Sequence, residues 1–200
     1  MRGVVNSYGG IMSQPQSNNA EEQFRQGIIL NSLGCNEEAL EAFRQAVQIR
    51  PDYVEAYFNI GLTYEKLNQY QEAIEAYKKV IEIKPDHAEA HFNLGVIYSK
   101  QERHEEALEA FKQAIWMKPD FAEARFYLGV TYDKLDRCQE AIEAYKQAIK
   151  VKPNYSEAHL NLGLLYLTLG ERDLALEQYR VIKFLDRSGA NKLFHLLYKV

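Results

Sequence analysis

The sequence predicts an all-α array of five helix pairs followed by one C-terminal capping helix, because a single pattern recurs every 34 residues. Alanine marks the pattern at Ala39, Ala73, Ala107, Ala141 and Ala175. An aromatic residue follows four positions later, at Phe43, Tyr77, Phe111, Tyr145 and Tyr179. A glycine and, in four units, a proline keep the same interval: Gly27, Gly61, Gly95, Gly129 and Gly163, then Pro51, Pro85, Pro119 and Pro153. A fixed interval of this length is typical of stacked repeats.

Each unit divides into two helices. Tyr57, Ile60, Gly61 and Tyr64 have the spacing of one helix face, and so do the residues from Ala73 onward in the second half of the unit. The turns between the two helices carry residues that tolerate a left-handed backbone, with Glu102 as the strained exception. These turn residues are Gly34, Asn68, Asp136 and Gly170.

The elements follow one another without gaps. Residues 1–19 are rich in Ser, Asn, Gln and Gly, so we expect a disordered leader, in which Met12 is a second candidate start. The five units then span 20–53, 54–87, 88–121, 122–155 and 156–189. Residues 190–200 form the capping helix, which Ser188 is expected to cap and whose apolar stripe covers the fifth unit. The stripe consists of Leu193, Leu196, Leu197 and Val200.

The third unit resembles the tetratricopeptide repeat (TPR) family most completely. It carries the family's Leu-Gly, Tyr, Ala, aromatic, Ala and Pro positions as Leu94-Gly95, Tyr98, Ala107, Phe111, Ala114 and Pro119. The resemblance covers residues 20–189 and implies a right-handed α-solenoid of five TPR units with a concave, partner-binding groove. The chain departs from the family where an early tryptophan is usual: Gln23, Tyr57, His91, Arg125 and His159 stand there.

Composition excludes several classes of function. The net charge is -4, and no basic face is clustered as nucleic-acid binding requires. No apolar run resembles a secretory signal or a membrane helix, so we expect no membrane insertion and a cytoplasmic location.

We also expect no catalysis, no metal and no cofactor. Cys35 and Cys138 lie in turns three repeats apart, too far for a disulfide, and have no histidine partner. His87 and His91 are four residues apart, but no third ligand accompanies them, and packing is the favoured interpretation.

The groove candidate is the second face of each first helix. Its charged members are Glu55, Glu89, Lys66 and Lys100. A helix-terminal role is the stronger alternative for them, because Asp52, Asp86, Asp120 and Asn154 each precede a glutamate by three, as in a capping box, and the lysines complement the helix dipole.

Three asparagines lie in the middle of first helices, where capping cannot explain them: Asn59, Asn93 and Asn161. A row of carboxamides can hold the backbone of an extended peptide, and bonding to a neighbouring repeat is an equally good explanation. Tyr127 interrupts the row. Asparagine ladders of this kind are attributed to other TPR proteins, including superhelices attached to O-linked N-acetylglucosamine transferases.

Two apolar rows run beside the asparagines. One contains Phe58, Phe92, Phe126 and Leu160, and the next contains Leu62, Val96, Val130 and Leu164. They would select apolar side chains of a ligand or, as an equal alternative, pack adjacent first helices against each other.

Two further places are candidates for contact with a partner or a second copy. Phe194 and Tyr198 widen the apolar arc of the capping helix beyond what one neighbour requires. Trp116 stands where three other units carry polar residues and only the fifth carries an aromatic one, Phe184, although packing along its own helix is the favoured interpretation.

The sequence therefore predicts a non-catalytic adaptor that holds an extended segment of another protein. One alternative is a self-assembling scaffold that uses residues 190–200. The other is an accessory subunit of an enzyme such as a glycosyltransferase.

Overall fold

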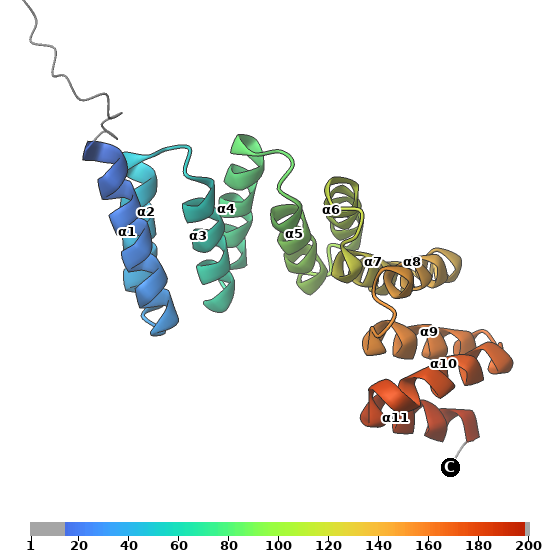
Figure 1. Cartoon of the computed structure of the whole chain (residues 1–200). Coiled ribbons are helices and arrows are strands. Elements are labelled where there is room, and N and C mark those ends of the chain that lie inside the picture. The colour runs from blue at the N-terminus through green and yellow to red at the C-terminus, as the bar shows by residue number, and fades with distance from the viewer. Residues whose placement is uncertain (1–14, 199–200) are drawn as a thin grey trace, which may run out of the picture. The chain divides into compact units, whose positions relative to one another are not determined.

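The computed structural model describes residues 15–198, and their side chains from residue 19 onward. This part of the chain forms eleven helices and no strand, so the prediction of an all-α repeat fold is confirmed. The helices are α1 (Pro15–Ser32), α2 (Asn36–Ile49), α3 (Val54–Lys66), α4 (Tyr70–Ile83), α5 (Ala88–Lys100), α6 (His104–Met117), α7 (Ala122–Lys134), α8 (Cys138–Val151), α9 (Ser156–Thr168), α10 (Arg172–Leu185) and α11 (Arg187–Tyr198) (Figure 1).

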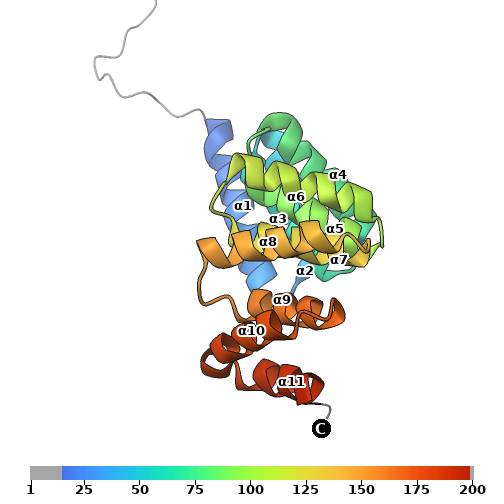
Figure 2. The same cartoon turned by 90° about the vertical axis from the view of Figure 1, so that its right-hand side faces the viewer.

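The chain divides into two compact units, Met1–Lys84 and Pro85–Val200. In unit 1, α1 packs on α2 and α3 on α4, while α2 also contacts α3. In unit 2, α5 packs on α6, α7 on α8 and α9 on α10, and α11 lies against both α9 and α10 (Figure 1, Figure 2). Within each unit the helices are thus antiparallel pairs stacked on their neighbours.

The recurring glycine permits the close approach of the two helices in a pair. A Cβ added to Gly61 would lie 2.6 Å from the Tyr77 ring, and one added to Gly95 would lie 2.6 Å from the Phe111 ring. Both rings are completely buried, so they have no room to retreat. The 34-residue spacing of glycine and aromatic residue therefore reports one packing contact that is made in each of the first four pairs, whereas Gly163 of the fifth pair faces Leu193 and Gln178.

The turns between paired helices confirm the sequence prediction. Gly34 and Gly170 have φ near +80°, and Asn68 and Asp136 have φ of 57° and 55°. Glu102 adopts φ of 59° in the third pair, where the backbone requires a left-handed residue and the sequence supplies a glutamate.

The predicted capping boxes are wrong. In the second unit the helix begins one residue later than expected, because the amide of Tyr53 donates to the carbonyl of Arg50 at 3.1 Å and closes a turn with Pro51 and Asp52 at its centre. Tyr53 is therefore the N-cap, and its side chain makes no capping bond. The same turn precedes α7 and α9.

The predicted leader boundary is also too late. α1 begins at Pro15, and proline at the first position of a helix loses no hydrogen bond, so residues 15–19 are helical. Residues 1–14, with the rest of the predicted disorder, lie outside the described residues.

α11 differs from its prediction at its start. Asp186, and not Ser188, caps it: the carboxylate accepts from the amides of Ser188 at 2.9 Å and Gly189 at 3.0 Å. Leu193 and Leu197 are buried against the fifth pair as predicted, but Leu196 is 53% exposed. Val200 lies outside the described residues.

Candidate functional site

The predicted asparagine row is partly engaged within the protein. Asn59 of α3 donates from Nδ2 to the carbonyl oxygen of Glu55 at 2.8 Å, one turn earlier in its own helix. Asn161 of α9 lies near the buried Tyr145 hydroxyl, and burial raises the pKa of Tyr145. That hydroxyl has no hydrogen-bond partner among the described residues. Asn93 is half-buried at the matching place on α5.

The predicted phenylalanine row packs against aromatic rings of the same chain. Phe58 lies 5.5 Å from the Tyr77 ring centroid, and Phe126 lies 5.1 Å from that of Tyr155. Phe92 contacts the rings of Phe111, Phe121 and Tyr127 at 4.9–5.8 Å. These rings are half-buried, and their contacts are mostly with the second helix of the same repeat or with the N-cap residue of the next first helix. Of these contacts, only that between Phe92 and Tyr127 joins two adjacent first helices, as the packing alternative predicts. The neighbouring Leu62, Val96 and Val130 are half-buried as well.

The charged members of the predicted groove also have local partners. Glu89 accepts from Lys118 Nζ at 3.3 Å, and Glu123 accepts from Lys152 at the same distance. Burial raises the pKa of Glu89, but hydrogen bonds to its backbone amide and to Lys118 lower it more, so this pKa lies below its ordinary value. The glutamates thus tie the start of a first helix to the end of the second helix of the same repeat.

The remaining charged candidates lie at helix ends. Lys66 and Lys100 are exposed in the last turns of α3 and α5, as a dipole-complementing role requires, and Lys66 donates to the Asn31 side chain. Glu55 is exposed in the first turn of α3.

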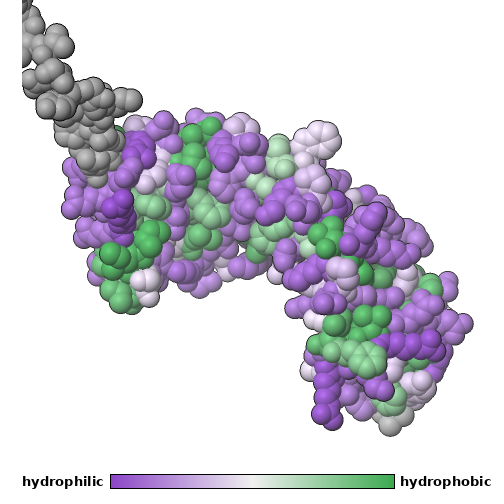
Figure 3. Space-filling model, in the orientation of Figure 1, coloured by the Kyte–Doolittle hydropathy of each residue, from purple (hydrophilic) through white to green (hydrophobic). Residues whose placement is uncertain are grey.

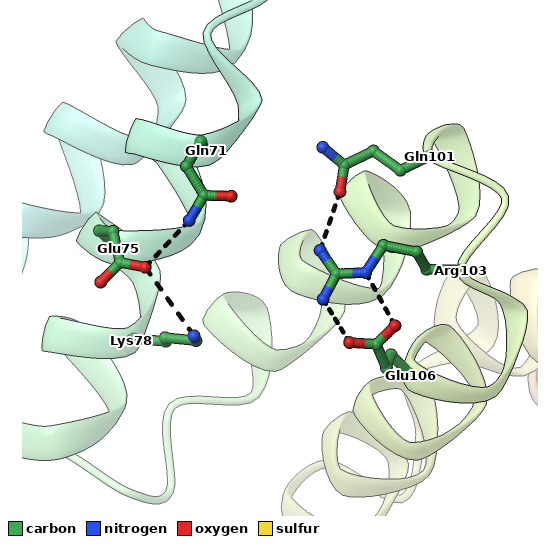
Figure 4. A network of polar contacts seen from close by, with 6 residues as sticks. All are labelled: Gln71, Glu75, Lys78, Gln101, Arg103 and Glu106. Atoms are coloured by element: carbon green, nitrogen blue, oxygen red, sulfur yellow. Dashed lines mark hydrogen bonds and ion pairs between the residues drawn. The ribbon is translucent and has the colours of Figure 1, made fainter.

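Other surface charges form local networks, one of which is drawn in each unit in Figure 4. In α4, Lys78 lies 3.9 Å from Glu75. At the start of α6, Arg103 donates from Nε to Glu106 at 2.7 Å and from Nη1 to Gln101 at 3.1 Å. These carboxylates have cationic partners at the surface, which is the ordinary arrangement of a solvated helix.

An open hollow continues the second apolar row at the end of α9. It has a volume of about 470 Å³ and is lined by Leu164, Leu167, Thr168, Gly170, Arg172 and Leu196. Leu164 belongs to the predicted row, whereas the partly exposed Leu196 comes from α11. The sequence could not place Leu196 here, because helical spacing assigns it to the capping stripe. Figure 3 shows unit 2 with apolar side chains gathered in the region of α9 to α11.

The aromatic pair of α11 lies at the surface, as predicted. Phe194 is 37% and Tyr198 47% exposed, and their ring centroids are 4.7 Å apart. Phe194 also contacts Tyr179, and Arg172 lies over the Tyr198 ring at 5.5 Å. One side of the pair is supported by α10, and the other is open.

Trp116 of α6 is 78% exposed, so its own helix covers little of the ring. The sequence interpretation that favoured packing along the helix is wrong in this respect. Trp116 borders a separate pocket with a volume of about 370 Å³.

The described residues offer no group suited to metal chemistry: no three His, Cys, Asp or Glu side chains gather there. His159 contacts Gln178 and the Pro153 carbonyl through its two ring nitrogens, at 2.8 and 3.0 Å, and His91 contacts the Pro85 carbonyl at 3.1 Å. Cys35 and Cys138 are free thiols. Among the described helices, none has the length and apolar character that crossing a bilayer requires.

Comparison with known proteins agrees with the repeat pattern. The model of the TPR repeat matches residues 27–68, 66–102 and 134–170, and that of the tetratricopeptide repeat matches residues 88–121. No match was found among curated proteins.

Solved structures resemble the chain over most of its length. A crystal structure of MamA is 28% identical with a TM-score of 0.76, covering 82% of this chain and 96% of that one. YrrB, described as a TPR protein with an unusual peptide-binding site, is 22% identical with a TM-score of 0.73, covering 90% and 97%. PilF of Pseudomonas aeruginosa is 18% identical with a TM-score of 0.74, covering 90% of each chain.

Proposed function

Because this chain belongs to the tetratricopeptide repeat family, we propose that it is a non-catalytic scaffold that holds an extended segment of a partner protein along the first helices of unit 2. The observation that carries the proposal is the hollow of Leu164, Leu167 and Leu196. It lies at the end of α9, the last of the first helices, on the face where the sequence predicts ligand contact.

The chemistry of the hollow suits an apolar side chain of a peptide. Its volume lies in the range of about 300–1,000 Å³ that is usual for ligand sites. Three leucines supply the apolar wall, and Arg172 and Thr168 supply polar groups at the rim. Covering the exposed part of Leu196 would remove apolar surface from water, which favours binding.

The asparagine and phenylalanine rows contribute less in this proposal than the sequence suggests. The Asn59 amide donates to its own helix, which leaves the carboxamide oxygen as an acceptor for a ligand. The phenylalanine rings pack against aromatic rings of the same chain, and none of them lines the hollow. YrrB, which has this fold, is described as having a peptide-binding site, and this is compatible with the proposal.

The test captures a partner protein with wild type and compares its affinity for wild type with its affinity for two variants. Leu196→Glu places a charge in the hollow at an exposed position, so the fold tolerates it. Phe184→Glu is the control, because Phe184 is 85% exposed on α10 and does not line the hollow. We expect Leu196→Glu to weaken binding about tenfold or more and Phe184→Glu to leave it unchanged. Equal affinity of both variants and wild type would refute the proposal.

A second candidate function is self-association through α11, which the exposed pair Phe194 and Tyr198 favours. An exposed aromatic pair on a terminal helix is a suitable interface between copies. Light scattering over a range of concentrations tests it: association that Phe194→Glu abolishes supports this function. A monomer at all concentrations excludes it.

A further inference from the structure

A second exposed aromatic site lies on α6 and α7, away from the residues of the hollow. The pocket has a volume of about 370 Å³ and is lined by Lys112, Ile115, Trp116, Pro119, Arg125 and Leu128. We call it the Trp116 pocket. Four of its residues are apolar, and the exposed indole of Trp116 forms one side. The position of Trp116 is held by Gln48, Glu82 and Lys150 in three repeats and by Phe184 in the fifth, so the repeat pattern does not require an aromatic residue there.

The polar groups of the Trp116 pocket are cations. Arg125 donates from Nε at 3.2 Å and from Nη2 at 2.8 Å to the carbonyl oxygen of Pro119, which fixes the guanidinium beside the pocket. Its Nη1 has no hydrogen-bond partner among the described residues. Among the described residues, the Lys112 ammonium has only the Tyr132 ring near it, 5.9 Å from the ring centroid. No acidic residue lines the pocket.

The next repeat provides a matched comparison. The equivalent pocket there is lined by Lys146, Ile149, His159, Leu162 and also by Glu177, an acid. His159 takes the place of Arg125 and is buried, with both ring nitrogens in contact with Gln178 and the Pro153 carbonyl. In that repeat the residue equivalent to Arg125 has both ring nitrogens in contact with protein groups and an acid lines the pocket, whereas the charged residues that line the Trp116 pocket are all cations, beside an exposed indole.

We propose that the Trp116 pocket is a second binding site, which takes a partner segment that presents an apolar side chain next to a carboxylate. The apolar side chain lies against Trp116, Ile115 and Leu128. The carboxylate accepts hydrogen bonds from Arg125 Nη1 and pairs with Lys112, an arrangement that charged donors favour. A positive apolar pocket selects against a lysine-bearing segment by the same charges.

The experiment uses the fluorescence of Trp116, which is the one tryptophan of the chain. The full chain is titrated with an acetylated and amidated glycine–serine peptide that contains leucine followed by two aspartates. A second peptide replaces both aspartates by lysine. We expect a saturable change in emission with the aspartate peptide. The lysine peptide should bind at least about tenfold more weakly.

Two variants separate the proposed contacts. Arg125→His introduces the residue found at the equivalent positions 91 and 159, so the fold is kept, and binding of the aspartate peptide should fall about tenfold. Phe184→Ala removes an exposed aromatic residue from the same repeat position as Trp116 and should change nothing. Leu196→Glu should also leave this titration unchanged, which distinguishes this site from the hollow.

Three results would overturn the proposal. These are no saturable response to the aspartate peptide, an equal response to the lysine peptide, and unchanged affinity in Arg125→His. Raised salt should weaken the binding, because an ion pair at the surface is screened.

Discussion

Side chains that recur in every repeat and side chains that occur once have different surroundings in this protein. Four of the five recurring glycines contact buried rings, and the recurring phenylalanines contact aromatic rings of the same chain. Trp116 and Leu196 do not recur, and both are exposed beside an apolar hollow. In this stacked array, residues that recur with the period therefore indicate packing contacts, and residues that depart from the period are better guides to binding surfaces.

The largest expected effect is on a recurring glycine. In Gly95→Ala the new Cβ meets the buried Phe111 ring, and overpacking of this kind costs about 1–3 kcal/mol, of which alanine returns up to about 1 kcal/mol in helix propensity. We expect the free energy of unfolding to fall by about 1–2 kcal/mol in urea denaturation. Gly163→Ala is the control, because its Cβ meets Leu193 and Gln178 and no aromatic ring, so a loss that depends on the ring should be smaller there. Equal losses would show that the aromatic contact is not the cause.

The next effect concerns a residue that occurs once. Asp186 accepts two amides at the start of α11, so Asp186→Ala should destabilise that helix by about 1 kcal/mol. Hydrogen exchange of the α11 amides measures it. Ser188→Ala serves as the control and should have no such effect. The reverse order of the two variants would restore the sequence prediction that Ser188 is the cap.

A smaller effect is expected for the asparagine row. Asn59→Ala removes a bond from a side chain to its own helix and gains helix propensity of roughly half a kcal/mol. Thermal unfolding should therefore show equal or slightly raised stability. A loss of more than about 1 kcal/mol would mean that Asn59 has a packing role beyond its hydrogen bond to the Glu55 carbonyl oxygen.

The smallest effect is a pH dependence. The pKa of Glu89 is lower in the folded protein than in the unfolded chain, so its ion pair with Lys118 contributes stability above the unfolded pKa, and this contribution is lost as pH falls through the folded pKa. Glu89 is half-exposed, so we expect less than about 1 kcal/mol. Glu89→Gln should flatten this part of the stability profile below neutral pH. An unchanged profile would show that the pair contributes nothing.

The sequence could predict the fold well, for physical reasons that particular residues make clear. Gly61 and Tyr77 carry the pair contact directly, and Asn68 and Gly170 mark turns that only a left-handed backbone can make. These features are local or recur at a fixed distance. Spacing alone therefore locates them.

The candidate site was harder to predict. Asp52 has the spacing of an N-cap, but it lies in a turn with Pro51. The backbone amide of Tyr53 donates to the Arg50 carbonyl and closes this turn, so the helix starts after Tyr53. Leu196 belongs by spacing to the buried stripe, yet the way α11 lies on α9 leaves it exposed beside Leu164. Which helix face is covered by a neighbour depends on contacts that no single helix encodes.

Quantitative affinity capture directly tests whether the hollow or the asparagine row binds the partner. It compares wild type, Leu196→Glu and the triple variant Asn59→Ala, Asn93→Ala, Asn161→Ala, side by side. We expect Leu196→Glu to lose most of the bound partner and the triple variant to keep it. Loss of the partner from the triple variant, with full retention by Leu196→Glu, would contradict this expectation and would assign binding to the recurring asparagines.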